Sequence, residues 1–176
     1  MKKLSCAIAL CLAASAWTLH AQVVKETVPG ITNLSRVETT VACAGAITPD
    51  SVAEIKKMGF KSVVNLREAS EQGANIEAEA AAAKAAGIKF IHIPFNSAMP
   101  DPAVVDRFLK AMAESGTEPA FIHCASGNRA AAMWLIKRAL VDKWDLERAT
   151  AEASQLGLTS ATLKNFAIDY VQKHKK

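Results

Sequence analysis

The stretch Pro119–Val141, with the sequence PAFIHCASGNRAAAMWLIKRALV, decides the fold. Its first five residues form a short, largely apolar run, which predicts a buried strand. Ala130–Val141 is apolar nearly all round in its first turns, as in a buried helix. The small residues between these segments, with Gly127, allow a tight loop. A buried strand that leads through a tight loop into a buried helix is typical of an α/β domain with parallel strands.

Strand and helix patterns alternate along the rest of the chain. Apolar runs predict further strands, and helical periodicity, alanine-rich composition and capping residues predict helices. The predicted strands are 37–44, 60–66 and 88–94, and the predicted helices are 48–59, 75–86, 101–115, 145–156 and 160–172. We therefore predict one α/β domain, residues 37–176, with a largely parallel central sheet flanked by helices. The polar residues 22–36 are expected to be a lead-in segment.

The N-terminus has the pattern of a secretory signal peptide. Two lysines precede the apolar run Leu4–Leu19, and Ala21 offers a cleavage site before Gln22. We expect residues 1–21 to be removed, a periplasmic or secreted protein, and no stable membrane association afterwards. A retained N-terminal anchor is the alternative. The remaining chain is only weakly basic, which gives no argument for nucleic acid as a partner.

The cysteines bear on both redox chemistry and metal binding. Cys6 and Cys11 leave with the signal peptide, so Cys43 and Cys124 remain. Two cysteines make neither a disulfide framework nor a zinc site, and we predict no metal and no cofactor. Export places both thiols in an oxidising compartment, which motivates the hypothesis of a regulatory Cys43–Cys124 disulfide. Otherwise Cys43 is a small core residue.

The loop His123–Arg129 carries the chemistry that the sequence predicts. Loops of this kind can point several backbone N–H groups at one anion, and the following helix adds its N-terminal amides. Cys124 would lie at the bottom of this cradle as a thiolate, and Arg129 offers a planar fork for an oxyanion. An inert buried cysteine is the alternative. The substrate-binding residues predicted from the loop are Ala125, Ser126, Gly127 and Asn128.

A second polar loop follows the predicted strand 60–66. Arg67, Glu68 and Glu71 stand at the carboxyl end of that strand, where sites of α/β sheets are found. They are therefore candidates to line the same site, with Arg67 as a second positive charge for the substrate. The alternative is a solvated loop.

The region Thr48–Leu158 resembles the dual-specificity branch of the protein tyrosine phosphatases. It is most similar to the bacterial phosphatase-like domain often called beta-lactamase-hydrolase-like. The residues that carry the resemblance are Gly59–Arg67 (GFKSVVNLR), Ile91–Pro94 (IHIP) and the loop that ends at Arg129. The resemblance implies a dual-specificity phosphatase-like fold.

The resemblance also implies a mechanism for the hydrolysis of phosphomonoesters. Cys124 would attack phosphorus and form a cysteinyl-phosphate, while Arg129 and the loop amides bind the equatorial oxygens. An Asp in the loop after Ile91–Pro94 would protonate the leaving group. Asp101 is the candidate, although its position also suits a helix cap. His123 would shape the loop. The substrate would be a phosphorylated small molecule or a phosphoprotein.

Two departures from the family pattern leave other functions open. Only four residues separate Cys124 from Arg129, one fewer than in the usual phosphatase loop. That length is typical of rhodanese-like sulfurtransferases, so sulfur transfer through a Cys124 persulfide is one alternative. Ala130 also stands where many phosphatases have Ser or Thr. A non-catalytic module that binds an oxyanion or a phosphorylated ligand is therefore the other alternative.

Overall fold

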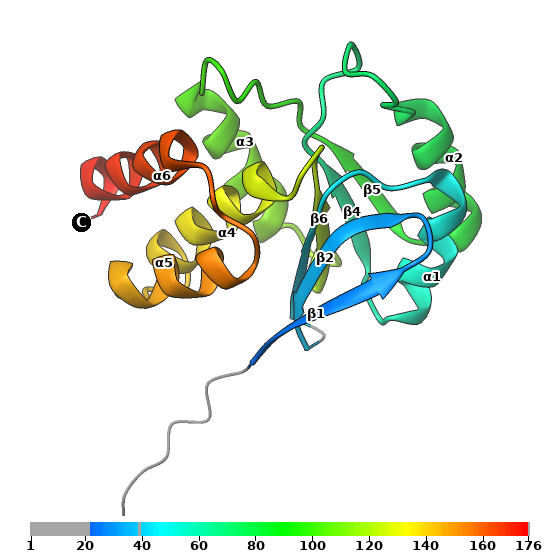
Figure 1. Ribbon diagram of the computed structural model, residues 1–176, viewed down its shortest axis with the longest axis horizontal. Coiled ribbons are helices and arrows are strands. Elements are labelled where there is room, and N and C mark those ends of the chain that lie inside the picture. The colour runs from blue at the N-terminus through cyan, green and yellow to red at the C-terminus, as the bar shows by residue number, and fades with distance from the viewer. Residues whose placement is uncertain (1–21, 39, 176) are drawn as a thin grey trace, which may run out of the picture.

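The central sheet has six strands in the order β1-β2-β3-β6-β4-β5 (Figure 1). The computed structural model describes residues 22–38 and 40–175, so the predicted signal peptide lies outside the described residues. The strands are β1 (Val23–Val28), β2 (Ile31–Val37), β3 (Val41–Ala44), β4 (Ser62–Asn65), β5 (Lys89–His92) and β6 (Ala120–His123). The helices are the short 3-10 helix η1 (Pro49–Ser51), α1 (Val52–Lys57), α2 (Ile76–Ala86), α3 (Pro102–Ala113), α4 (Asn128–Leu140), α5 (Leu146–Gln155) and α6 (Ala161–His174).

The four strands β3, β6, β4 and β5 run parallel, and β1 and β2 extend the sheet antiparallel. The prediction of an α/β domain with a largely parallel sheet is confirmed. The parallel strands end level with one another, because Ala44 and Asn65 both pair with His123, and Asn65 also pairs with His92. The loops that follow the parallel strands therefore start from one edge of the sheet, where ligands of such sheets bind.

The structure differs from the sequence prediction mainly near the N-terminus. Residues 22–36, expected as a lead-in segment, belong to the hairpin of β1 and β2. The single strand expected at 37–44 is divided, because Val37 ends β2 and β3 begins at Val41. The alternation expected of a half-buried strand is weak here, since β1 is an edge strand with little buried surface. The helix expected from Ala130 begins two residues earlier, at Asn128.

Helices cover both faces of the sheet and create two apolar cores. Figure 1 shows α1 and α2 on one face and α3–α6 on the other. The larger core contains Cys43, Ile122 and Cys124 together with most of α4, and the smaller one contains Phe60 and Phe121. Every residue from Arg129 to Ala139 is buried, which confirms that α4 is a buried helix. The helix that starts at the chemical loop is thus held on all sides by packing.

Polar contacts join α5 to α4 at the end far from the loop. The carboxylate of Glu152 accepts hydrogen bonds from Trp134 Nε1 at 2.7 Å and from Arg138 Nε at 2.8 Å. A buried carboxylate needs such partners. Among the described residues, no helix is long and apolar enough to cross a membrane.

Candidate active site

The loop between β6 and α4 holds a buried thiol that accepts a hydrogen bond from the loop's own backbone. Cys124 is 1% exposed, and its Sγ accepts a hydrogen bond from the Gly127 amide at 3.1 Å. Gly127 is the N-cap of α4 and has a φ of 100°, a backbone conformation that residues other than glycine rarely adopt. Within the part of the chain that the structure describes, the amides of Ala125, Ser126 and Arg129 find no acceptor. These N–H groups are available to an anion bound above Cys124.

The outer side of the loop is fixed by contacts to two other segments. The Cys124 amide donates to Ala44 O at 3.2 Å, and Ala125 O accepts from the Ala46 amide at 3.1 Å. Asn128 Oδ1 accepts from the Thr159 amide at 2.8 Å. A Cβ atom at Gly45 would lie 3.0 Å from Ala125 O, so a side chain there would force the loop to shift by a few tenths of an ångström. The loop is therefore held in one shape before a ligand arrives, as an anion site requires.

Arg129 is positioned by a carboxylate that lies far from it in sequence. Its Nη1 donates to Glu71 Oε1 at 2.6 Å and its Nη2 to Glu71 Oε2 at 2.8 Å, a bidentate pair. Nη1 also donates to Leu66 O and Phe95 O, at 3.1 and 2.7 Å. These contacts engage Nη1 and one hydrogen of Nη2. The Nε hydrogen and the second Nη2 hydrogen remain available to a ligand in the site.

The charges of Glu71 and Arg129 shift each other's pKa values. Burial alone would raise the pKa of Glu71, but hydrogen bonds from Arg129 and from the Glu68 amide lower it from 4.5 to about 2. Burial alone would lower the pKa of Arg129, but the bonds to Glu71 and the nearby Cys124 raise it. Opposite charges at this distance favour the ionised forms of both groups. Cys124 thus lies close enough to Arg129 to interact with its charge, and the roles of the two residues as nucleophile and oxyanion ligand stay predictions.

Arg67 holds the loop that carries Glu71 rather than standing open to solvent. Its side chain is 4% exposed, and it donates to Gly73 O, Gln72 O and Glu71 Oε2 at 3.0, 2.6 and 3.3 Å. A guanidinium with these partners shapes the 68–73 loop and thereby places Glu71. The geometry gives Arg67 a positioning role, and direct contact with a substrate stays a prediction.

His123 is fully buried beside a carboxylate that sequence reasoning missed. Its Nε2 lies 3.1 Å from Glu79 Oε2, and neither side chain is exposed. Glu79 Oε2 also accepts from Asn65 Nδ2 at 2.6 Å, and Asn65 Oδ1 accepts from the Arg67 amide at 2.7 Å. This chain of contacts joins the end of β6 to the start of the Arg67 loop. It supports the expectation that His123 shapes the site.

Asp101 lies at the start of α3, in the loop that follows β5. It is the N-cap of that helix, and its Oδ1 accepts from the Ala103 amide at 2.9 Å. The carboxylate is exposed, so its second oxygen remains available to other partners. The structure therefore places Asp101 as a cap, and its role as proton donor stays a prediction.

Cys43 lies on β3, opposite Ile122 of β6, on the same face of the sheet as Cys124. Burial raises the pKa of Cys43 well above 9.0, and the charges of Cys124 and Glu152 raise it further. Both thiols are free in the structure. A disulfide between them stays a hypothesis.

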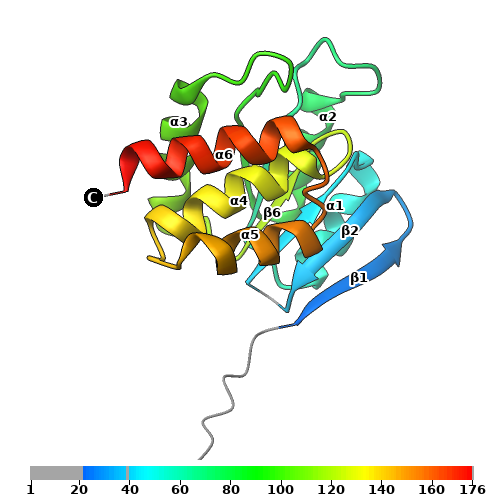
Figure 2. The same ribbon diagram turned by 60° about the vertical axis from the view of Figure 1, so that its left-hand side comes forward.

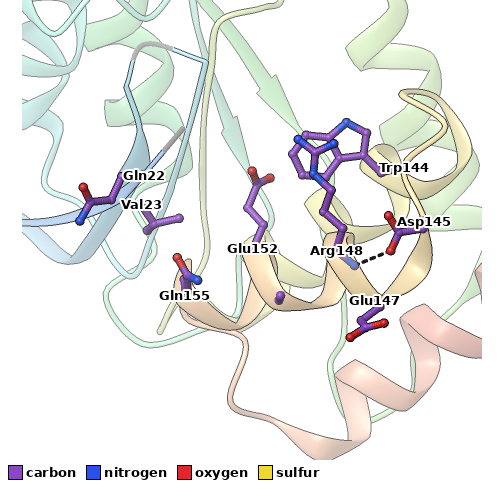
Figure 3. A pocket seen from close by; sticks show the side chains of 9 residues that line it. Gln22, Val23, Trp144, Asp145, Glu147, Arg148, Glu152 and Gln155 are labelled. Carbon is purple, nitrogen blue, oxygen red and sulfur yellow. Dashed lines mark hydrogen bonds between the residues drawn. The ribbon is translucent and has the colours of Figure 1, made fainter. Parts of the chain in front are cut away.

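A separate hollow lies away from the loop that carries Cys124. A hollow of about 690 Å³ lies between the hairpin and α5, lined by Gln22, Trp144 and Arg148 among others, but by no residue of the 124–129 loop (Figure 3). There Arg148 stacks on Trp144 at 3.5 Å. Within residues 22–38 and 40–175, no group of three or more His, Cys, Asp and Glu side chains is close enough to hold a metal ion.

Comparison with known proteins identifies the family. Residues 33–141 match the phosphatase-like domain of the beta-lactamase hydrolase-like proteins. The chain belongs to this family. The phosphatase-like domain is 30% identical over 118 residues to the beta-lactamase hydrolase-like protein of Agrobacterium fabrum (strain C58 / ATCC 33970), and the match covers 64% of this chain. It spans only 27% of that relative.

Solved structures show the same fold at low sequence identity. The phosphatase-like domain is similar to a DUF442 protein of Shewanella putrefaciens CN-32 (19% identical, TM-score 0.68, covering 84% of this chain and 96% of that one). It is also similar to P. aeruginosa TpbA in complex with pTyr (22%, 0.64, 90% and 93%). A third similar structure is the core catalytic domain of the PP-IP phosphatase SIW14 from S. cerevisiae with citrate (18%, 0.64, 82% and 88%). The family match confirms the resemblance to the beta-lactamase-hydrolase-like phosphatase-like domain, and these structures show that the fold is shared.

Proposed function

We propose that the phosphatase-like domain hydrolyses phosphomonoesters through a cysteinyl-phosphate on Cys124. The observation that carries the proposal is the buried thiol of Cys124 on a loop with amides that have no protein acceptor, next to the guanidinium of Arg129. Preorganised donors of this kind stabilise the charge of a phosphoryl group in the transition state. The family and the TpbA complex with pTyr support a phosphatase.

The reaction would proceed in two displacements. The Cys124 thiolate attacks phosphorus, the ester P–O bond breaks, and the leaving alkoxide takes a proton from the carboxyl of Asp101. Water then attacks the cysteinyl-phosphate, loses a proton to Asp101, and releases phosphate and the thiolate. Arg129 and the loop amides hold the equatorial oxygens in both steps, because the charge on these oxygens persists.

The first experiment is p-nitrophenyl phosphate hydrolysis by the reduced protein across pH 5–8. Cys124→Ser is the test variant and Cys43→Ser the matched control, because both remove one buried thiol from the same core. We expect turnover in the wild type and the control and none in Cys124→Ser. Equal turnover in the two serine variants would refute Cys124 as the nucleophile.

A second candidate function is oxyanion or phospho-ligand binding without turnover. It is favoured by Ala130, which is fully buried where many phosphatases have a hydroxyl, and by the cap that Asp101 forms. Tight phosphate binding with no hydrolysis and no trapped cysteinyl-phosphate would indicate this function. Transfer of sulfur from thiosulfate to cyanide would instead indicate the sulfurtransferase suggested by the four-residue loop.

We further propose that the protein is exported and acts in the periplasm or outside the cell. The lysines and apolar run of residues 1–21 support this proposal. N-terminal sequencing of the protein from the native host's extracytoplasmic fraction should begin at Gln22. Recovery of the full-length chain from the cytoplasm would contradict the proposal.

A further inference from the structure

Two polar side chains, those of Asn65 and His123, lie at the ends of the two central strands. They are paired across β4 and β6, so both project from the same face of the sheet. Val63 and Phe121, two residues earlier on these strands, belong to the smaller core on the side of α1 and α2. This face lies away from α4, α5 and α6 (Figure 2). Cys124 belongs to the larger core on the other face.

Glu79 of α2 contacts both of these side chains. Its Oε2 accepts a hydrogen bond from Asn65 Nδ2 at 2.6 Å and lies 3.1 Å from His123 Nε2. All three residues are fully buried. The helix α2 buries only two side chains, those of Glu79 and Ala83, so its contact with the sheet is made by one carboxylate among small residues.

The stability of the fold does not account for this carboxylate. Within the described part of the chain, Glu79 Oε1 and both ring nitrogens of His123 are buried and make no hydrogen bond. Buried polar atoms without partners destabilise a fold. Apolar side chains at these positions would pack without that cost, since replacing a buried polar cluster by apolar groups is often stabilising.

From Asn65, further contacts lead to the arginine of the site. Asn65 Oδ1 accepts a hydrogen bond from the Arg67 amide at 2.7 Å, and Arg67 Nε donates to Glu71 Oε2 at 3.3 Å. Glu71 then forms the bidentate pair with Arg129. The end of β4 and the start of the following loop are therefore connected to the guanidinium by side-chain contacts.

From His123, the chain itself leads to the thiol, because Cys124 is the next residue. Glu79 thus contacts one residue that leads to Cys124 and another that leads to Arg129. The loop between β6 and α4 closes these contacts into a ring. A shift of either strand end would change the position of the thiol relative to the guanidinium.

We propose that Glu79 is a positioning residue for the reaction, which fixes Cys124 and Arg129 relative to each other by holding the ends of β6 and β4. The inference rests on the proposed phosphatase function and adds a residue to the same site. Glu79 acts through His123 and Asn65 from the opposite face of the sheet. A displacement of about 1 Å caused by a change far from the reacting atoms can lower a rate about 100-fold.

The test compares Glu79→Gln with the matched control Glu152→Gln. Both variants replace a buried carboxylate by an amide of the same size, and Glu152 accepts from Trp134 and Arg138 at the end of α4 far from the loop. Both should lower Tm. At a temperature where each variant is folded, only Glu79→Gln should weaken phosphate binding, by about tenfold in calorimetry, because a charge-assisted hydrogen bond becomes a neutral one. Its kcat for p-nitrophenyl phosphate should fall at least about tenfold.

A double variant tests the path from Glu79 to Arg129. Glu71→Gln alone should also weaken phosphate binding about tenfold. If Glu79 acts through Glu71, the two losses are not additive, and the double variant should bind phosphate about tenfold more weakly than the wild type. A loss of about 100-fold, the product of two independent effects, would overturn the proposal.

The remaining outcomes separate this inference from the phosphatase proposal. If Glu79→Gln lowers Tm but leaves phosphate affinity and kcat within twofold of the wild type, Glu79 has only a structural role and the inference is wrong, although hydrolysis continues. If the wild type binds phosphate but hydrolyses no ester, the phosphatase proposal fails, and the phosphate affinities alone decide the role of Glu79. Asn65→Ser removes the same contact from the side of β4 and should give the same tenfold loss, so it replaces Glu79→Gln if that variant does not fold. A wild type that binds no phosphate would overturn both proposals.

Discussion

Replacement of Glu71 by Gln tests whether a remote carboxylate positions the oxyanion-binding arginine. Gln keeps the size and one acceptor oxygen of Glu71 but removes its charge and its second acceptor. The bidentate pair with Arg129, at 2.6 and 2.8 Å, becomes at most a single neutral contact. Arg129 then keeps Leu66 O and Phe95 O as partners, but the edge that Glu71 aligned is free to rotate.

The expected loss of stability follows from the pKa of Glu71. A fall from 4.5 to about 2 corresponds to at most about 3 kcal/mol of stabilisation at neutral pH. The Glu71 side chain is 21% exposed, so solvent screening reduces this to about 1–2 kcal/mol. For a chain of this size, Tm falls by about 2–4 °C per kcal/mol.

The pH dependence has a definite sign. Because folding lowers the pKa of Glu71, its contribution is fully present above pH 4.5 and is lost as the pH falls from 4.5 towards 2. The difference in Tm between wild type and Glu71→Gln should therefore shrink over that range. Phosphate binding at pH 7 should weaken about tenfold, the cost of one poorly aligned charge-assisted hydrogen bond.

The assays are thermal unfolding from pH 2 to 7 and phosphate binding by calorimetry. Glu68→Gln is the control, because Glu68 lies in the same loop and makes its contacts to Glu71 through its backbone alone. It should change Tm and phosphate binding little. If Glu71→Gln matches wild type in both Tm and phosphate affinity, Glu71 does not position Arg129.

Three further predictions concern the other acidic and thiol groups. Asp101→Asn keeps the cap of α3 and should leave Tm within about 1 °C. It should lower kcat about 100-fold for alkyl phosphates, and less for p-nitrophenyl phosphate. If kcat equals that of the wild type, Asp101 is not the proton donor. Glu79→Ala should destabilise the fold by about 3–5 kcal/mol in urea unfolding, because it leaves buried polar partners unpaired, whereas exposed Glu77→Ala should cost less than about 0.5 kcal/mol; similar values for both would contradict the buried contact. Oxidation should pair Cys43 with Cys124, and thiol counts that are equal before and after reduction would rule the disulfide out.

Local patterns predicted most of the elements but not the hairpin. The parallel strands and all the larger helices were predictable because apolar runs, alanine-rich segments and caps such as Asp101 are properties of adjacent residues. The hairpin of β1 and β2 was missed, since an edge strand buries little and Lys25, Glu26 and Thr27 show no clear alternation.

The candidate site, like the fold, was predictable from the sequence only in part. The stretch Pro119–Val141 alone determined that a cysteine and an arginine stand on a tight loop between a buried strand and a buried helix, because glycine conformation and periodicity act over a few residues. Only the tertiary structure decided that Glu71 fixes Arg129 and that Glu79 lies beside His123. These contacts join segments that are far apart in sequence, and they depend on strands β4 and β6 being neighbours with level ends. Strand order is set by the packing of the whole sheet and its helices, which no local pattern encodes.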